Sequence, residues 1–304
     1  MGSGLFASSH AAREVFEKAD EALGYSLSRI IFQGPEEELT RTENAQPAIL
    51  AVSIATKAVI EQEIGTPLAP YLVAGHSLGE YTALVAARAL TLEDGVRLVH
   101  LRGKWMQEAV PLGRGSMAAI LGLDPDRVEE ACKEASMGQV CSPANFNGPG
   151  QVVISGHAEA VARAVEIARK MGARKAIPLK VSAPFHCTLM EPVADRLFES
   201  FSACSWESPD FPLVNNVSAT VIRSTEEIRQ ALRKQTFSPV RWLESVREME
   251  KSGISHFLEI GPGNVLSGLV RKGCKDATTY DTSTRENFLK LVAALRGKEV
   301  GTVG

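Results

Sequence analysis

One serine has the surroundings that a nucleophile requires, because it stands in the sequence Gly75-His76-Ser77-Leu78-Gly79. The apolar run 71–74 before it indicates a buried strand, and residues 78–89 after it follow a helical pattern. Strand, G-x-S-x-G and helix form a nucleophile elbow, a strained turn that exposes the serine hydroxyl. In such an elbow the backbone N–H of Leu78 points to where a tetrahedral oxyanion would form. This pattern favours acyl-transfer chemistry at Ser77 over a simple structural turn.

A serine nucleophile needs a general base, and the chain offers six histidines. Three of them have charged neighbours in helical or turn positions and are interpreted as solvated or capping side chains: His10, His100 and His157. His76 adjoins the serine, but consecutive residues of a strand point to opposite faces. The remaining candidates are His186, which follows Pro184-Phe185, and His256, which lies in a predicted strand. The residues alone do not choose between these two.

The composition narrows the class of protein. The 304 residues are 44% apolar and 23% charged, as expected for one large globular domain or two smaller ones. A net charge of −3 gives no reason to expect a nucleic-acid or membrane-surface partner. No apolar run approaches the roughly 18 residues of a membrane span. The five cysteines form an odd set without a C-x-x-C pair, which predicts reduced thiols in a cytoplasmic protein and no zinc site.

The hydrophobic periodicity predicts an α/β fold, in which the elbow belongs to a parallel sheet covered by helices. Before and after the elbow, helices are expected at 7–22, at 47–64 with Pro47 in the first turn, and at 92–110. Helices and strands alternate again in the last third of the chain. The helices expected there span 190–203, 224–235, 239–251 and 263–272, and the strands span 212–217 and 254–259.

Between these two parts the pattern changes to strand, helix, strand, strand, helix, strand. The strands are predicted at 116–121, 139–144, 151–155 and 175–179, and the helices at 124–135 and 157–171. This βαββαβ order is typical of a compact ferredoxin-like unit. We therefore expect residues 114–181 to form an inserted subdomain, and residues 1–113 and 182–304 to form a hydrolase-like catalytic core.

Five motifs occur in one order along the chain, and together they resemble the malonyl-CoA:acyl carrier protein transacylases of bacterial type II fatty acid synthesis. The motifs are Gly75 to Tyr81, Arg102 to Gln107, Asn145 to Asn147, Ser182 to His186 and Glu259 to Gly263. The resemblance implies an acyltransferase that moves malonyl from malonyl-CoA to the phosphopantetheine thiol of acyl carrier protein through a malonyl-serine. It implies no metal or organic cofactor, and we expect a monomer.

The resemblance also implies the catalytic roles. Ser77 matches the acylated serine and His186 the general base, which the residues alone left open. In this family a backbone carbonyl orients the histidine, and the matching position is Gln235. A carbonyl can fix the imidazole tautomer, but it stabilises imidazolium less than a carboxylate would. Leu78 matches one of the two backbone oxyanion donors.

Substrate contacts follow from the same resemblance. Arg102 matches the arginine that pairs with the free carboxylate of malonyl, a bidentate contact suited to a guanidinium. If Arg102 is buried, an acetyl group would leave its charge unpaired and be rejected. Phe185 is expected to disfavour a methyl branch on the acyl group, or else to be a core aromatic. The other residues expected along the pocket and the pantetheine channel are His76, Met106, Gln107, Asn145, Asn147 and Gln151. An alternative for the last three is a place in a turn.

The chain departs from the family pattern at its start. The family begins with a buried strand and a Pro-Gly-Gln-Gly turn, whose glutamine N–H is the second oxyanion donor. Here Met1 to Leu5 aligns after that turn, which predicts a misplaced start or a truncation. Loss of one such donor costs about 10²–10³ in kcat.

Acyl carrier proteins are acidic, so a basic docking surface is expected near the mouth of the site, with Arg174, Lys175, Arg271 and Lys272 as candidates.

Two other functions are alternatives to the transacylase. One alternative is a serine hydrolase of the α/β class, which would use Asp210 and His256. The other is a binding protein that holds CoA esters without acylating Ser77. An acyltransferase of polyketide synthesis would use the same residues as the transacylase.

Overall fold

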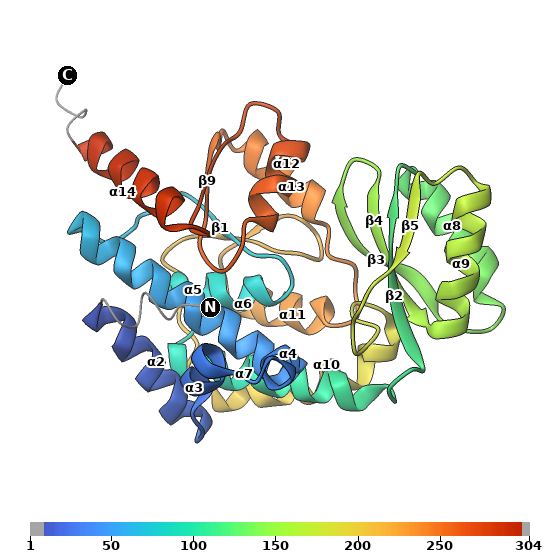
Figure 1. Ribbon diagram of the computed structural model, residues 1–304, viewed down its shortest axis with the longest axis horizontal. Helices are drawn as coiled ribbons and strands as arrows, with labels where there is room; N and C mark the ends of the chain where they lie inside the picture. The colour runs from blue at the N-terminus through green and yellow to red at the C-terminus, as the bar shows by residue number, and fades with distance from the viewer. Residues whose placement is uncertain (1–8, 300–304) are drawn as a thin grey trace.

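The computed structural model describes residues 9–299, in a helix-rich larger part and a smaller part built on a four-stranded sheet (Figure 1). The predicted departure at Met1 to Leu5 lies outside the described residues. In the larger part, α2 (His10–Leu23), α5 (Thr42–Ile64) and α7 (Leu92–Ala109) pack against one another. Their apolar faces form the largest cluster of buried side chains. The short helix after the elbow, α6 (Leu78–Ala86), packs against α5 and α7.

The long helix α5 begins at Thr42, five residues before its predicted start, so Pro47 lies inside the helix and not in its first turn. A proline lacks the N–H that would bond the carbonyl four residues earlier, here that of Glu43. The Nδ1 atom of His100, on α7, lies 3.0 Å from this oxygen and can donate to it. His100 is half-buried in this contact, which corrects its interpretation as a solvated or capping side chain.

Two small sheets stand where the sequence predicted the parallel sheet. β1 (Val73–Ala74) pairs in parallel with β6 (Leu213–Val214), which pairs antiparallel with β7 (Val221–Ile222). β8 (His256–Glu259) and β9 (Thr278–Asp281) form a separate parallel pair. The α/β class is therefore confirmed, and its sheets are short and partly mixed.

The side chain of Asn215 explains why β6 ends at Val214, three residues before its predicted end. Its Oδ1 accepts hydrogen bonds from the backbone N–H groups of Val217 and Ser218, at 3.1 and 2.9 Å. An asparagine that bonds its own following backbone produces a turn. The chain therefore reverses into β7, a strand that the apolar pattern did not predict.

The other helices of the larger part surround these sheets. They are α3 (Leu27–Gln33), α4 (Glu36–Thr40), α10 (Glu191–Ser200), α11 (Thr225–Gln235), α12 (Trp242–Lys251), α13 (Val265–Gly273) and α14 (Arg285–Glu299), with 3₁₀ turns at Thr188–Met190 and Phe201–Ala203. The helices predicted at 190–203, 224–235, 239–251 and 263–272 are all present, with shifted ends. α3, α4 and β9 had no counterpart in the sequence prediction.

The smaller part has the predicted order of elements, βαββαβ. These elements are β2 (Gly115–Leu121), α8 (Pro125–Ser136), β3 (Cys141–Gly148), β4 (Gln151–His157), α9 (Ala158–Lys170) and β5 (Lys175–Pro178). The strand order is β3-β4-β2-β5 and all neighbours are antiparallel. Each helix therefore connects two strands that have another strand between them. The two helices pack on the sheet and enclose a separate apolar core (Figure 1, right).

Backbone hydrogen bonds join the two parts between β3 and the segment before α12. Phe146 N–H donates to the carbonyl of Val240, and Val240 N–H donates to the carbonyl of Ala144, each at 2.9 Å. β3 thus continues through residue 148 instead of ending at residue 144, because its end pairs with the segment before α12 as well as with β4. This extension places Asn145 and Asn147 in a strand, which corrects their alternative interpretation as turn residues.

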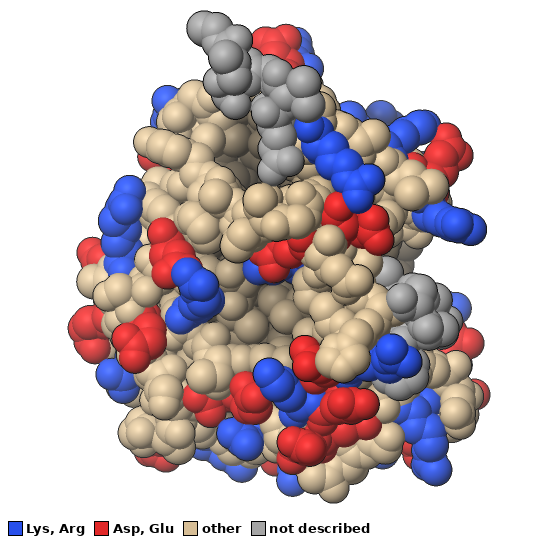
Figure 2. Space-filling view, turned by 90° about the vertical axis from the view of Figure 1, so that its left-hand side faces the viewer, with Lys and Arg blue, Asp and Glu red and all other residues tan. Residues whose placement is uncertain are grey.

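The surface carries no large field of a single sign on the face shown in Figure 2, where acidic and basic side chains alternate among uncharged ones. Within residues 9–299, no helix combines the length and the apolar character needed to cross a membrane.

Candidate active site

The turn at Ser77 is strained and tightly packed. Ser77 has φ 54° and ψ −106°, and a positive φ is rare for a residue with a side chain. It lies between β1 and Leu78, the first residue of α6. A Cβ on Gly75 would lie 1.9 Å from the backbone of Gly79, so the absence of a side chain at Gly75 allows strand and helix to approach closely. This is the strand–turn–helix geometry that the sequence predicted.

The carboxamide of Asn216 holds this turn in place. Its Oδ1 accepts from the Ser77 N–H at 2.7 Å, and its Nδ2 donates to the Gly75 carbonyl at 2.7 Å. The side chain of Asn216 is fully buried, and its hydrogen bond to the Gly75 carbonyl is buried with it. Leu78 begins α6, and N–H groups at the start of a helix have no partner within it. The Leu78 N–H is therefore suited to receive an oxyanion.

His186 is the histidine that contacts the serine. Its Nε2 lies 2.7 Å from Ser77 Oγ, and its Nδ1 lies 2.9 Å from the backbone oxygen of Gln235. Because a carbonyl oxygen only accepts, Nδ1 carries the proton and Nε2 is free to accept the one on Ser77. Burial, with a smaller contribution from the positive charge of Arg102, lowers the pKa of His186 to about 3. The ring is therefore neutral at pH 7 and can act as a base.

The residues that a hydrolase would need lie elsewhere. His256 is exposed on β8, where its Nδ1 lies 3.0 Å from Ser255 Oγ. Asp210 forms an ion pair with Arg88 at the surface. The arrangement of Ser77, His186 and a backbone carbonyl thus replaces the carboxylate-containing triad.

Arg102 is buried beside the serine hydroxyl, with 2% of its surface exposed. Its Nη2 donates to Ser77 Oγ and to Gln235 Oε1, each at 3.0 Å, and its Nη1 donates to Gln46 Oε1 at 2.7 Å. These acceptors are all uncharged oxygens, and Nε has no hydrogen-bond partner within residues 9–299. A buried guanidinium in such surroundings favours an anionic ligand, because its charge is costly to bury without a counter-ion.

The glycine after Arg102 brings the two long helices together at this point. A Cβ on Gly103 would lie 2.4 Å from the carbonyl oxygen of Thr42, so only glycine allows α7 to approach the start of α5 this closely. This approach places Arg102, on α7, within hydrogen-bond distance of Gln46, on α5. The close approach of α7 to α5 therefore explains why the motif Arg102 to Gln107 has glycine at its second position.

Three polar residues of the site were missed by the sequence analysis: Gln46, Glu80 and Asn216. Glu80 is fully buried, and its Oε2 accepts from Gln235 Nε2 at 2.7 Å. Burial raises the pKa of Glu80 to about 7, against the opposing effect of its hydrogen bonds and of Arg102. One signal could have revealed Glu80 and Asn216, namely a polar side chain inside an otherwise apolar segment, where it needs a partner.

Two of the predicted pocket residues contact each other. His76 Nε2 lies 2.8 Å from Asn147 Oδ1, and the His76 ring packs against Trp242 with 5.6 Å between ring centroids. The contact joins the elbow to β3 of the smaller part. Asn145 is buried in the same strand.

The predicted pocket also includes the apolar residues Met106 and Phe185. Met106 is fully buried, and its Sδ lies 4.0 Å from Gln46 Nε2. Phe185 is half-buried and packs against the cluster around Met106 as well as against the cluster around Met117. Gln107 donates to the carbonyl of Ser182 at 3.1 Å, in the segment that leads to His186.

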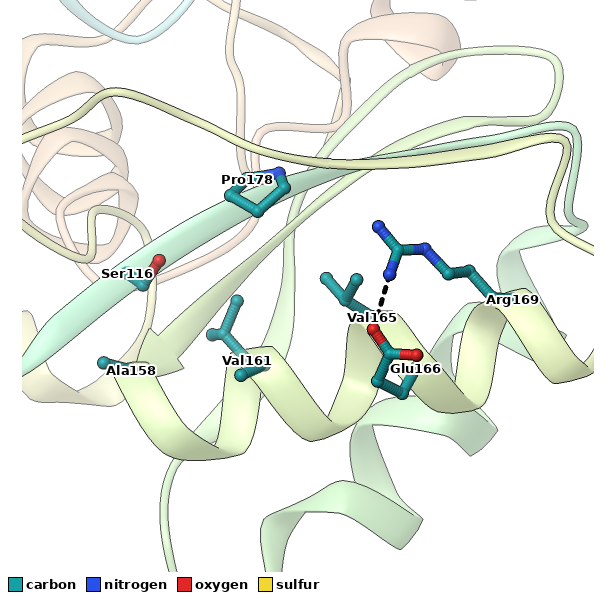
Figure 3. A pocket seen from close by; sticks show the side chains of 8 residues that line it. Ser116, Ala158, Val161, Val165, Glu166, Arg169 and Pro178 are labelled. Carbon is teal, nitrogen blue, oxygen red and sulfur yellow. Dashed lines mark hydrogen bonds and ion pairs between the residues drawn. The ribbon is translucent and has the colours of Figure 1, made fainter.

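A surface depression in the smaller part is unrelated to this chemistry (Figure 3). It lies between α9 and the edge of the sheet, with the ion pair of Glu166 and Arg169 beside it. Its lining residues are Ser116, Ala158, Val161, Ala162, Val165, Glu166, Arg169 and Pro178, all from β2, α9 and β5. Ser77 and His186 belong to other elements, in the larger part.

Residues 1–289 match the family model of the acyl transferase domain. The chain belongs to the acyl transferase family. This acyltransferase is 48% identical over 272 residues to the malonyl CoA-acyl carrier protein transacylase of Escherichia coli K12, an alignment that covers 90% of this chain and 87% of that protein. The transacylase of Bacillus subtilis is 46% identical, with 97% and 93% covered.

Solved structures of acyltransferases agree closely with the fold. A malonyl-transacylase in complex with a type II PKS acyl-carrier protein has a TM-score of 0.93 and 45% identity, covering 97% of this chain and 94% of that one. The malonyl CoA-acyl carrier protein transacylase of Coxiella burnetii has a TM-score of 0.93 and 42% identity, covering 97% and 93%.

Proposed function

We propose that this acyltransferase moves the malonyl group of malonyl-CoA to the phosphopantetheine thiol of acyl carrier protein, in fatty acid biosynthesis and in the cytoplasm. The observation that carries the proposal is the buried guanidinium of Arg102, 3.0 Å from Ser77 Oγ. It stands where the free carboxylate of an acyl group attached to Ser77 would need a partner. The names of the relatives in E. coli and B. subtilis support the same substrate and acceptor.

In the first half-reaction Ser77 Oγ attacks the thioester carbonyl of malonyl-CoA and passes its proton to His186 Nε2, 2.7 Å away. The oxyanion that forms lies against the Leu78 N–H. The carbon–sulfur bond then breaks, and CoA leaves as a thiol after taking the proton from His186. The product is malonyl-Ser77.

The second half-reaction runs through the same groups in reverse. The pantetheine thiol gives its proton to His186 Nε2 and attacks the ester carbonyl of malonyl-Ser77. Ser77 Oγ leaves and recovers the proton. Throughout, the Gln235 carbonyl keeps the proton of His186 on Nδ1, so that Nε2 always faces the reaction.

Arg102 selects malonyl in two ways. An acyl group without a carboxylate leaves the buried guanidinium without an anionic partner, which lowers affinity. The charge of Arg102 also contributes to the low pKa of His186. A carboxylate bound to Arg102 offsets this charge and makes His186 a stronger base once malonyl is in place. We expect Phe185, Met106 and His76 to shape the acyl pocket, and Asn145 and Asn147 the entrance for pantetheine.

The division of the chain into domains is part of the proposal. We propose that residues 1–113 and 182–304 form the catalytic core and that residues 114–181 form an inserted subdomain. The separate apolar core of the four-stranded sheet supports this division. A carrier protein would bind where the two parts meet.

Basic residues of both parts lie there. Lys272 Nζ, from α13, lies 3.3 Å from Gln151 Oε1, from β4. Arg174 packs beside Gly122, whose N–H donates to the carbonyl of Gly150, the residue before Gln151. Arg174, Lys175, Arg271 and Lys272 are all exposed, which suits a docking surface for an acidic protein.

The test measures acyl transfer from malonyl-CoA and from acetyl-CoA to holo acyl carrier protein, by the mass gained by the carrier. The unaltered chain is expected to transfer malonyl and to reject acetyl. The Arg102→Gln variant should lose malonyl transfer and gain acetyl transfer, because it lacks both the carboxylate partner and the charge that weakens His186. Arg97→Ala, an exposed residue of the same helix, is the matched control. Equal loss of both activities in Arg102→Gln would contradict the proposed selection.

A second candidate, an acyltransferase of polyketide synthesis, is favoured by the likeness to the malonyl-transacylase that binds a type II PKS acyl-carrier protein. Both candidates use the same chemistry. The rates of transfer to a fatty-acid carrier and to a polyketide carrier, measured side by side, distinguish them.

A further inference from the structure

Glu80 is a buried carboxylate that takes no part in the two half-reactions, yet it lies one side chain away from the arginine that selects the acyl group. Its Oε2 accepts from Gln235 Nε2 at 2.7 Å, and Gln235 Oε1 accepts from Arg102 Nη2 at 3.0 Å. The Gln235 carboxamide thus lies between Glu80 and Arg102. All three side chains are at most 2% exposed.

Glu80 and the backbone oxygen of Ser77 together fix the orientation of this carboxamide. The Nε2 group of Gln235 donates to two acceptors, Glu80 Oε2 and the backbone oxygen of Ser77, the latter at 2.8 Å. With both amide hydrogens used on this side, the Oε1 atom must face Arg102. A carboxamide rotated by 180° would present an N–H to the guanidinium, which has only donors. Such a contact would repel Arg102 from its place beside Ser77.

We propose that Glu80 is a positioning residue for malonyl selection: through the Gln235 carboxamide it holds Arg102 where the malonyl carboxylate binds. The inference rests on the proposed function of Arg102. Glu80 acts through its hydrogen bond with Gln235 Nε2, which requires a side chain of this length. The negative charge of Glu80 is dispensable. The pKa of about 7 agrees with this, because the carboxyl is readily neutral at this depth.

Three substitutions separate reach from charge. Glu80→Gln keeps an oxygen that can accept from Gln235 Nε2 and removes the charge. Its new amide would face the backbone N–H of Asn216, whose contact with Glu80 is long, at 3.4 Å, so little is lost there. Glu80→Asp keeps a carboxyl group but is one carbon too short to reach Gln235. Glu80→Ala removes both.

The experiment measures the dissociation constants of malonyl-CoA and acetyl-CoA by calorimetry in the Ser77→Ala background, where no acylation occurs. Acylation of the unaltered chain by malonyl-CoA, followed separately by intact mass, tests the proposed function independently. Circular dichroism and the unfolding temperature identify any variant that fails to fold. The quantity compared is the ratio of the two dissociation constants, acetyl over malonyl.

We expect the ratio to fall about tenfold or more in Glu80→Ala and Glu80→Asp, because the guanidinium is then no longer held where the malonyl carboxylate binds. Glu80→Gln should keep the ratio of the parent within about threefold. A merely structural role would lower the unfolding temperature and weaken both esters equally, which would overturn the proposal. Loss of the ratio in Glu80→Gln with retention in Glu80→Asp would overturn it in favour of charge. Equal binding of the two esters by the Ser77→Ala parent would also overturn it, because no selection would exist for Glu80 to support.

Discussion

The surroundings of Ser77 and the four-stranded sheet are stabilised in different ways. Around Ser77 the buried groups are polar and hold one another: Gln46, Glu80, Arg102, His186, Asn216 and Gln235. The core of the smaller part consists mainly of alanines, valines and isoleucines between two helices and a sheet. The first arrangement fixes atoms to within a hydrogen bond, and the second fixes a shape. Activity and stability should therefore respond to different substitutions in the two regions.

The largest effect is expected from the base. His186→Ala removes the proton acceptor of Ser77 and should slow acylation by malonyl-CoA about 10²–10⁴-fold. The burst of CoA release in a rapid-mixing experiment measures this rate. His256→Ala, an exposed histidine, is the control and should leave the rate unchanged. If His256→Ala and not His186→Ala stopped the burst, the hydrolase arrangement would be correct instead.

An apolar substitution in the sheet should show the opposite behaviour. Ile154 in β4 is 1% exposed, and Ile154→Ala should lower the free energy of unfolding by about 2–5 kcal/mol. The acylation rate of the folded protein should stay the same, because Ile154 lies in the separate apolar core. Denaturant unfolding and the CoA burst measure the two quantities. Ile177→Ala, on the exposed side of β5, is the matched control with little effect on either. A slowed burst in Ile154→Ala would show that the two regions are coupled.

The buried acid should make the folded protein less stable as the pH rises from about 4.5 to about 7. The pKa of Glu80 is about 7 in the folded protein against an ordinary 4.5, so between these values the folded state holds a proton that the unfolded state has lost. Stability therefore falls as the pH rises through this window, by roughly 3 kcal/mol at most. Glu80→Gln, which cannot ionise, should lose less stability between pH 5 and pH 8 than the unaltered chain. Identical pH profiles of unfolding would contradict the assignment, and the exposed Glu36→Gln variant controls for surface charge.

The smallest effect is expected at the turn itself. Asn216→Ala removes two hydrogen bonds from the strained backbone at Ser77 and should slow acylation about tenfold. Asn215→Ala, its neighbour, disturbs only the turn into β7 and should affect the unfolding temperature more than the rate. A similar rate for both variants would mean that the elbow holds its conformation without Asn216.

The two regions also differ in how far their structure could be predicted from the sequence. The βαββαβ order follows from local periodicity, since each strand and helix of the smaller part has its own apolar face. Ser77 and His186 were predicted because motifs mark them. The network that joins them links residues 25 to 158 positions apart, and hydrogen bonds at such separations leave no local pattern.

Particular elements show where local patterns mislead. Pro47 predicted the start of a helix, but His100, from a distant helix, bonds the carbonyl that the proline leaves free. The sequence predicted a strand as far as Val217, and the carboxamide of Asn215 ended it early. In both places a single polar contact outweighed the intrinsic preference of the segment.

The site of acylation shows directly whether Ser77 is the nucleophile. The protein is mixed with malonyl-CoA, quenched in acid, and its intact mass and peptide masses are measured. One malonyl adduct is expected on the peptide that contains Ser77, and no adduct in Ser77→Ala. An adduct of the same amount in Ser77→Ala would contradict this expectation.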